Sequence, residues 1–123
     1  YGKNLNPDGG FFGDFENSLF VYVTVMSTPA EDRALVDAGL KALAMDSGPP
    51  TVADMPGVEF GRASDEHGIL NIAKANHPVR LGDKLKLIPG HCDPTVNMYD
   101  WYVGYRGDRV EALWPIVARG MLR

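Results

Sequence analysis

The chain has 123 residues, of which 45% are hydrophobic, and a formal net charge of −4 at neutral pH. This length fits one domain, and no apolar run reaches the roughly 20 residues that a membrane-spanning helix needs. No basic block is present, which argues against a nucleic-acid partner. The single cysteine excludes an internal disulfide and favours a reducing, cytoplasmic location.

The first third of the chain begins with a polar, glycine-rich segment, residues 1–17, which we expect to be a loop or linker. Ser18–Ser27 is dense in β-branched and aromatic residues and predicts a strand. Both of its alternating faces are largely apolar, so we expect it to be covered on both sides. Thr28–Glu31 then has the features of a helix start, but the apolar pattern that continues to Ala44 is poor for a helix. This stretch stays open between helix and strand.

The middle of the chain alternates between turn signals and short strand-like runs. Asp46–Pro50 and Thr51–Gly57 are expected to be loops, because proline removes a backbone donor and fixes φ. Strands are predicted at Val58–Phe60, at Ile69–Ile72 and, half-exposed, at Lys84–Leu87. Several short strands separated by turns predict a mainly β fold, a small antiparallel β barrel or sandwich domain with at most one or two short helical turns.

The last strands form a predicted hairpin. It joins Trp101–Tyr105 to Val110–Trp114 through the two-residue turn Gly107-Asp108. Pro115 should end or bulge the second strand, and the chain beyond it, at 117–120, should be extended or frayed. The two tryptophans, one on each arm, are expected to be cross-strand aromatics of the core.

His91 and Asp93 form the constellation that looks most like a metal site. In an extended backbone, residues i and i+2 lie on one face, so both side chains could reach one ion while Cys92 points the other way. An imidazole with a carboxylate suits a divalent ion such as Mn, Mg, Co or Zn, and two protein ligands leave positions for water or substrate. The commoner alternative for such a pair is a solvated or hydrogen-bonded one, and Cys92 is interpreted as a small buried hydrophobe.

Longer motifs place this pair in a family. They are Pro-Gly-His-Cys-Asp-Pro-Thr-Val-Asn at 89–97, Tyr-Asp-Trp-Tyr-Val at 99–103, Val-Glu-Ala-Leu-Trp-Pro at 110–115, Phe15–Phe20, Asp37–Leu43, Asp46–Gly48 and Ser64–Gly68. In this order, across nearly the whole chain, they resemble the C-terminal β domain of the D-threonine aldolases. These enzymes belong with the D-serine dehydratases to the pyridoxal-phosphate enzymes of the alanine-racemase fold type.

The resemblance implies that 18–123 is a C-terminal metal-binding β domain and that the pyridoxal-phosphate-binding barrel lies outside this chain, which begins at Tyr1 rather than Met. No lysine here stands in a context typical of a Schiff-base lysine, and no glycine-rich phosphate loop is evident. We therefore expect the fragment alone to be inactive, with the N-terminal barrel of the same enzyme and a second copy in a homodimer as partners. The family also places a short strand at Arg33–Asp37, ended by Gly39, and a helical turn at Leu40–Ala44.

The implied activity is that of a lyase, which cleaves a D-β-hydroxy-α-amino acid by a retro-aldol reaction, for example D-threonine to glycine and acetaldehyde. A metal held by His91 and Asp93 would bind and acidify the β-hydroxyl of the substrate. The D-serine dehydratases carry His-x-Cys here and bind zinc, whereas a carboxylate favours Mn or Mg. The alternatives are a D-serine dehydratase or amino-acid racemase on the same fold, or a non-catalytic β module for dimerisation.

Four further residues are candidates for the site. Asp65 is expected to hydrogen-bond a metal-bound water or contact the substrate, and His67 to steady its turn, although a polar surface turn is the plain alternative. Asp46 would border the active site of a neighbouring subunit, as the fold type implies, or would only shape its loop through an Asx turn. Thr95, also a candidate for that border, should hold the metal loop together with Asn97 through backbone hydrogen bonds.

Overall fold

The computed structural model describes residues 16–121, so most of the predicted linker 1–17 lies outside the described residues. Within them the fold is mainly β, as predicted. The elements are β1 Val21–Ala30, β2 Arg33–Val36, β3 Thr51–Ala53, β4 Glu59–Ala63, β5 Gly68–Asn71, β6 Lys84–Ile88, α1 Cys92–Val96, β7 Trp101–Arg106 and β8 Arg109–Pro115. No helix in the described part is long and apolar enough to span a membrane.

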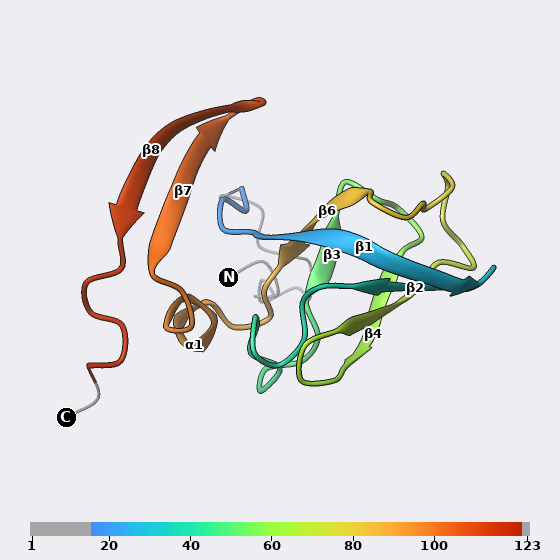
Figure 1. Cartoon of the computed structure of the whole chain (residues 1–123), viewed down its shortest axis with the longest axis horizontal. Coiled ribbons are helices and arrows are strands. Elements are labelled where there is room, and N and C mark those ends of the chain that lie inside the picture. Colours follow the sequence, from blue (N-terminus) through green and yellow to red (C-terminus); the bar gives the residue numbers. More distant parts are fainter. Residues whose placement is uncertain (1–15, 122–123) are drawn as a thin grey trace, which may run out of the picture.

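Six strands form one antiparallel sheet in the order β3-β6-β1-β2-β5-β4. The long strand β1 pairs with β6 through its first half, where Val21 faces Leu87, and with β2 through its second half, where Val25 faces Val36. Register shifts follow Val25 in β1 and Phe60 in β4, and such bulges bend strands. The sheet curls until its two edge strands, β3 and β4, approach each other, which gives a nearly closed barrel (Figure 1).

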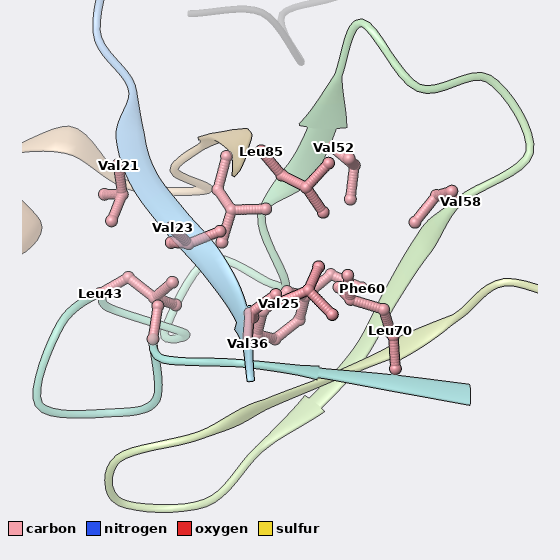
Figure 2. Packing of buried hydrophobic residues seen from close by; sticks show 13 residues of the cluster. Val21, Val23, Val25, Val36, Leu43, Val52, Val58, Phe60, Leu70 and Leu85 are labelled. Atoms are coloured by element: carbon pink, nitrogen blue, oxygen red, sulfur yellow. The ribbon is translucent and has the colours of Figure 1, made fainter. Parts of the chain in front are cut away.

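The core fills this barrel with the inward side chains of all six strands (Figure 2). It consists of Val21, Val23, Val25, Ala34, Val36, Ala38, Leu43, Val52, Val58, Phe60, Leu70, Leu85 and Leu87. The opposite face of β1 is open, because Tyr22 is 67% exposed and Met26 is 50% exposed. The prediction that β1 is covered on both sides is therefore wrong within the described residues, since its apolar outer side chains have no layer above them.

Leu87 is fully buried at 0% exposure, on the strand that joins β1 to β3. We expect Leu87→Ala to lower the free energy of unfolding by about 2–5 kcal/mol, because it leaves a cavity in a closed core. Urea denaturation monitored by far-ultraviolet circular dichroism measures this. Leu81→Ala is the matched control, since Leu81 is 69% exposed, and it should change stability by less than about 0.5 kcal/mol. Equal losses in both variants would contradict this packing.

The stretch 28–44, which the sequence left open between helix and strand, contains no helix start, because Thr28–Ala30 is the end of β1, and it continues as a strand and a turn. β2 occupies Arg33–Val36, and the amide of Leu43 donates to the carbonyl of Gly39, which closes one helical turn as the family resemblance implied. Two other predictions fail. Thr51–Ala53 is not loop but strand β3, whose three residues are too few to show an alternating pattern. The segment 117–120 is not extended, because it forms hydrogen-bonded turns such as Arg119 N–H to Ile116.

The predicted hairpin is confirmed as a separate two-stranded sheet, β7–β8, which stands away from the six-stranded sheet and follows α1 (Figure 1). Gly107 has φ +60°, which a glycine adopts readily at such a turn. Trp101 and Trp114 are each 56% exposed, so the prediction that they are core residues is wrong. Among residues 16–121 no strand of the six-stranded sheet packs against this ribbon, which explains the exposure. The Lys86 ammonium lies 5.5 Å from the Tyr105 ring and links the hairpin to β6.

Candidate metal centre

The candidate site lies where the chain leaves β6 and enters α1. His91 has an extended backbone, with φ −141° and ψ 118°, and α1 begins at the next residue. The prediction that Asp93 is also extended is wrong, because it lies in the first turn of α1. Pro94 fits there since the first turn of a helix needs no backbone N–H from it. Asp93 is helical even though the residue before a proline usually avoids helical angles.

The structure nevertheless brings His91 and Asp93 together. Nε2 of His91 lies 3.8 Å from Oδ2 of Asp93, and the side chains are 40% and 89% exposed. Two metal–ligand bonds of about 2.1 Å each can join ligand atoms that lie up to about 4.2 Å apart. A single divalent ion can therefore contact both Nε2 of His91 and Oδ2 of Asp93. The donor set, one imidazole nitrogen and one carboxylate oxygen, also fits such an ion.

Two protein ligands leave most coordination positions of such an ion to other groups. Within residues 16–121, no group of three or more His, Cys, Asp or Glu side chains is arranged to hold a metal. Water, a substrate, or groups outside the described residues would have to complete the coordination. An open site of this kind suits catalysis better than a structural role.

Asp46 contacts the same imidazole from the opposite side. Its Oδ2 lies 2.6 Å from Nδ1 of His91 and accepts a hydrogen bond from the Ser47 hydroxyl at 3.2 Å. The hydrogen bond with His91 lowers the pKa of Asp46, and this outweighs the opposing effect of desolvation. Asp46 was predicted to border a neighbouring active site or to shape its loop, and its contact with His91 was missed. No local pattern links residues 45 positions apart.

Two glycines allow the two loops to meet. A Cβ atom on Gly90 would lie 2.5 Å from the carbonyl oxygen of Gly48, so this contact requires a residue without a side chain. Gly48 itself has φ +95°, a backbone conformation that favours glycine. Close approach of the backbones at Gly48 and Gly90 therefore places Asp46 beside His91.

Thr95 joins these two loops by hydrogen bonds. It is 2% exposed, its hydroxyl donates to the His91 carbonyl at 2.7 Å, and its Oγ1 accepts from the Ala44 amide at 3.1 Å. The expectation that Thr95 holds the His91 loop through backbone hydrogen bonds is confirmed, whereas its place at the border of an active site stays a prediction. Asn97 acts elsewhere, because its Oδ1 accepts from the Gly120 amide at 2.7 Å and so fixes the C-terminal turn.

Cys92 is partly exposed rather than a buried hydrophobe, which corrects that interpretation. Its Sγ lies 3.4 Å from Oδ1 of Asp93, the carboxylate oxygen that does not face His91. Cys92 and Asp93 line an open hollow of about 440 Å³ together with side chains from the hairpin and its flanks. Of the two candidate ligands, Asp93 lines this hollow and His91 does not.

The turn that carries Asp65 and His67 packs against a different segment. The amides of Leu40 and Lys41 donate to the carbonyls of Ser64 and Asp65, and the Lys41 ammonium lies 2.9 Å from Glu66. Among the described residues, no hydrogen bond or ion pair joins this turn to the His91 pair. The roles of Asp65 and His67 beside a metal stay predictions.

Fold and site together define a class of small β-barrel domain that presents an open imidazole–carboxylate pair at the end of a strand. The family follows from sequence comparison. The family model described as "Putative serine dehydratase domain" matches residues 18–105, and the chain belongs to this family of D-serine dehydratase-like domains.

The relatives are enzymes that act on hydroxylated D-amino acids. The chain is 48% identical over 122 residues to the 3-hydroxy-D-aspartate aldolase of Paracoccus denitrificans, covering 98% of this chain and 31% of the enzyme. It is 46% identical over 109 residues to a D-threonine aldolase of Arthrobacter, covering 89% of this chain and 29% of that enzyme. The chain thus spans about a third of the length of these curated relatives.

Solved structures agree with this assignment. The crystal structure of the D-threonine aldolase from Filomicrobium marinum superposes with a TM-score of 0.85 at 40% identity, covering 98% of this chain and 32% of that one. A metal-free form of a D-threo-3-hydroxyaspartate dehydratase mutant gives a TM-score of 0.67 at 29% identity, covering 78% of this chain and 31% of that one. The resemblance to the D-threonine aldolases is therefore confirmed.

Proposed function

We propose that this chain is the C-terminal, metal-binding domain of a pyridoxal-phosphate-dependent lyase that cleaves D-β-hydroxy-α-amino acids by a retro-aldol reaction. The observation that carries the proposal is the pair of His91 Nε2 and Asp93 Oδ2, 3.8 Å apart and open to solvent, in a chain 46–48% identical to two kinds of aldolase. D-Threonine, which would yield glycine and acetaldehyde, is the simplest substrate of this class.

The residues of this chain would bind and orient rather than perform the bond cleavage. His91 and Asp93 would hold a divalent ion at the edge of the hollow that Cys92 and Asp93 line. The bound ion would acidify the β-hydroxyl of the substrate, while pyridoxal phosphate, held elsewhere in the enzyme, would accept the electrons released at the α-carbon. Asp65 belongs to the proposal as a contact to a metal-bound water or to the substrate, and His67 as the residue that steadies its turn.

The identity of the metal follows from the carboxylate. Asp93, not a thiolate, faces Nε2 of His91, and carboxylates suit harder ions, so we propose Mn²⁺ or Mg²⁺ rather than Zn²⁺. Cys92 Sγ lies 3.4 Å from the far oxygen of Asp93. A dehydratase is the second candidate, because the fold also matches a D-threo-3-hydroxyaspartate dehydratase at 29% identity.

The remainder of the enzyme would supply the cofactor site. The chain covers only 31% of its aldolase relative, which leaves room for a cofactor-binding barrel. The exposed apolar side chains of the β7–β8 hairpin support a further domain or a second copy against this part of the molecule, since large exposed apolar patches commonly mark interfaces. A homodimer in the cytoplasm, with this fragment inactive by itself, completes the proposal.

Release of acetaldehyde from D-threonine by the full-length enzyme tests the proposal. We expect activity to disappear after treatment with EDTA and to return when Mn²⁺ is added, because the β-hydroxyl loses its Lewis acid. Activity that is indifferent to EDTA would contradict the metal role. 2-Oxobutanoate with ammonia, or threonine epimerised at the α-carbon, in place of acetaldehyde would instead identify a dehydratase or a racemase.

A further inference from the structure

The imidazole of His91 is held between two carboxylates that contact different ring nitrogens. Asp46 Oδ2 lies 2.6 Å from Nδ1, whereas Asp93 Oδ2 lies 3.8 Å from Nε2. The first distance is that of a strong hydrogen bond, and the second leaves space for an ion between the two atoms. Asp46 and Asp93 therefore cannot have the same role.

The chemistry of the two nitrogens determines which one is free. A neutral imidazole carries one N–H donor and one lone-pair acceptor, and an ionised carboxylate can only accept. Because the Asp46 carboxylate, 2.6 Å from Nδ1, acts as an acceptor, Nδ1 of a neutral His91 carries the proton, so its lone pair lies on Nε2 and faces Asp93.

We propose that Asp46 is a positioning residue that fixes the Nδ1-protonated tautomer and the ring orientation of His91, so that Nε2 is presented to a divalent ion beside Asp93. This inference rests on the proposed function of the His91–Asp93 pair. Histidines that bind metals almost always donate their other N–H to a carboxylate, a carbonyl or water, and a carboxylate also raises the basicity of the ligand nitrogen.

Several contacts distinguish this arrangement from a chance surface ion pair. Such exposed pairs contribute little, because two mobile side chains must be ordered to form them. Here the backbones on both sides are already fixed, by the contact of Gly90 with Gly48 and by the two hydrogen bonds of buried Thr95. The Ser47 hydroxyl also donates to Asp46 Oδ2 and restrains the carboxylate. The orientation of His91 is thus set before any ion binds.

Binding of Mn²⁺ to the full-length, metal-depleted enzyme tests the proposal, with free Mn²⁺ measured by electron paramagnetic resonance. We expect Asp46→Ala to weaken binding about 10- to 100-fold. Asp46→Asn should also weaken it, because the amide carries no charge and can turn an N–H toward Nδ1. Asp54→Asn is the matched control, since it removes the charge of an exposed loop carboxylate that pairs with Lys86, and it should leave affinity unchanged.

The tautomer itself gives a second measurement that needs no metal. In metal-free enzyme labelled with ¹⁵N-histidine, the two ring nitrogens of His91 report which one carries the proton, and the signal is assigned by its loss in His91→Gln. We expect the parent and Asp54→Asn to show protonation at Nδ1, and Asp46→Ala to lose the dominance of this tautomer. Circular dichroism confirms that each variant is folded.

The outcomes separate the two levels of the proposal. If Asp46→Ala binds Mn²⁺ as tightly as the parent and keeps the Nδ1-protonated tautomer, while His91→Gln loses binding, the role of Asp46 is wrong and the metal site stands. If His91→Gln binds Mn²⁺ as the parent does, the proposed metal site itself fails. Weaker binding together with a changed tautomer in Asp46→Ala supports the positioning role.

Discussion

Replacement of His91 or Asp93 by alanine in the full-length enzyme is expected to reduce kcat/KM for D-threonine by roughly 10³-fold. The reason is that each change removes one of only two candidate ligands, and a metal that acts as a Lewis acid contributes several kcal/mol to the transition state, at about 1.4 kcal/mol per tenfold in rate. The absorbance of the cofactor should be unchanged, because the proposed function places the cofactor in another part of the enzyme.

His77→Ala is the control for the first of these variants, since His77 is an exposed loop histidine outside the candidate site. It should retain parental activity. Acetaldehyde release, measured with saturating Mn²⁺ and again with limiting Mn²⁺, shows whether lost activity follows lost metal. Normal turnover in either His91→Ala or Asp93→Ala would remove the pair from the mechanism and favour the interpretation of a structural loop.

Thr95→Val is expected to lower the free energy of unfolding by about 1–3 kcal/mol, because it leaves the buried Ala44 amide without its partner. The hydroxyl of Thr95 also donates to the His91 carbonyl, but this partly buried carbonyl, at the N-cap of α1, accepts an intrahelical hydrogen bond as well. Valine is nearly the same size as threonine, so the loss reports the hydrogen bonds and not a cavity. Mn²⁺ affinity should fall as well, since the same bonds hold the loop of His91.

Thr95→Ser separates the hydroxyl from the methyl group. It keeps both hydrogen bonds and should lose no more than about 1.5 kcal/mol, the order of one buried methyl group. Urea denaturation gives the stabilities, and titration with Mn²⁺ gives the affinities. If valine and serine at position 95 destabilise the protein equally, the hydroxyl of Thr95 does not hold the two loops together.

The strands with a strong local pattern could be read from the sequence. β6 alternates lysine with leucine, and the lysines are outside while Leu85 and Leu87 are buried. The hairpin was found because a two-residue turn with glycine lies between two β-rich runs. The prediction of β2 depended on the family resemblance, because a helix start signal precedes this strand. β3 was not predicted, because its three residues are too few to show an alternating pattern.

Errors of burial arose because the sequence shows which side chains are apolar but not whether another layer covers them. Tyr22 and Met26 on β1, and the tryptophans of the hairpin, have the residue types of a core and yet are exposed. For the hairpin, the reason is that a two-stranded ribbon has two faces and no sheet packed against either one in the described part of the chain. The apolar character of a side chain predicts that it should be buried, but it does not show which part of the structure covers it.

By itself, the sequence determined the β class of the fold, the family and the candidate pair His91 and Asp93, because these depend on local patterns and on motifs in a fixed order. Only the tertiary structure showed that Asp93 lies in a helix and that Asp46 hydrogen-bonds His91 across 45 positions. The physical reason is that this contact depends on the close approach of the Gly48 and Gly90 backbones and on the buried Thr95 hydroxyl. Such contacts are set by packing between distant segments, and no local pattern encodes them.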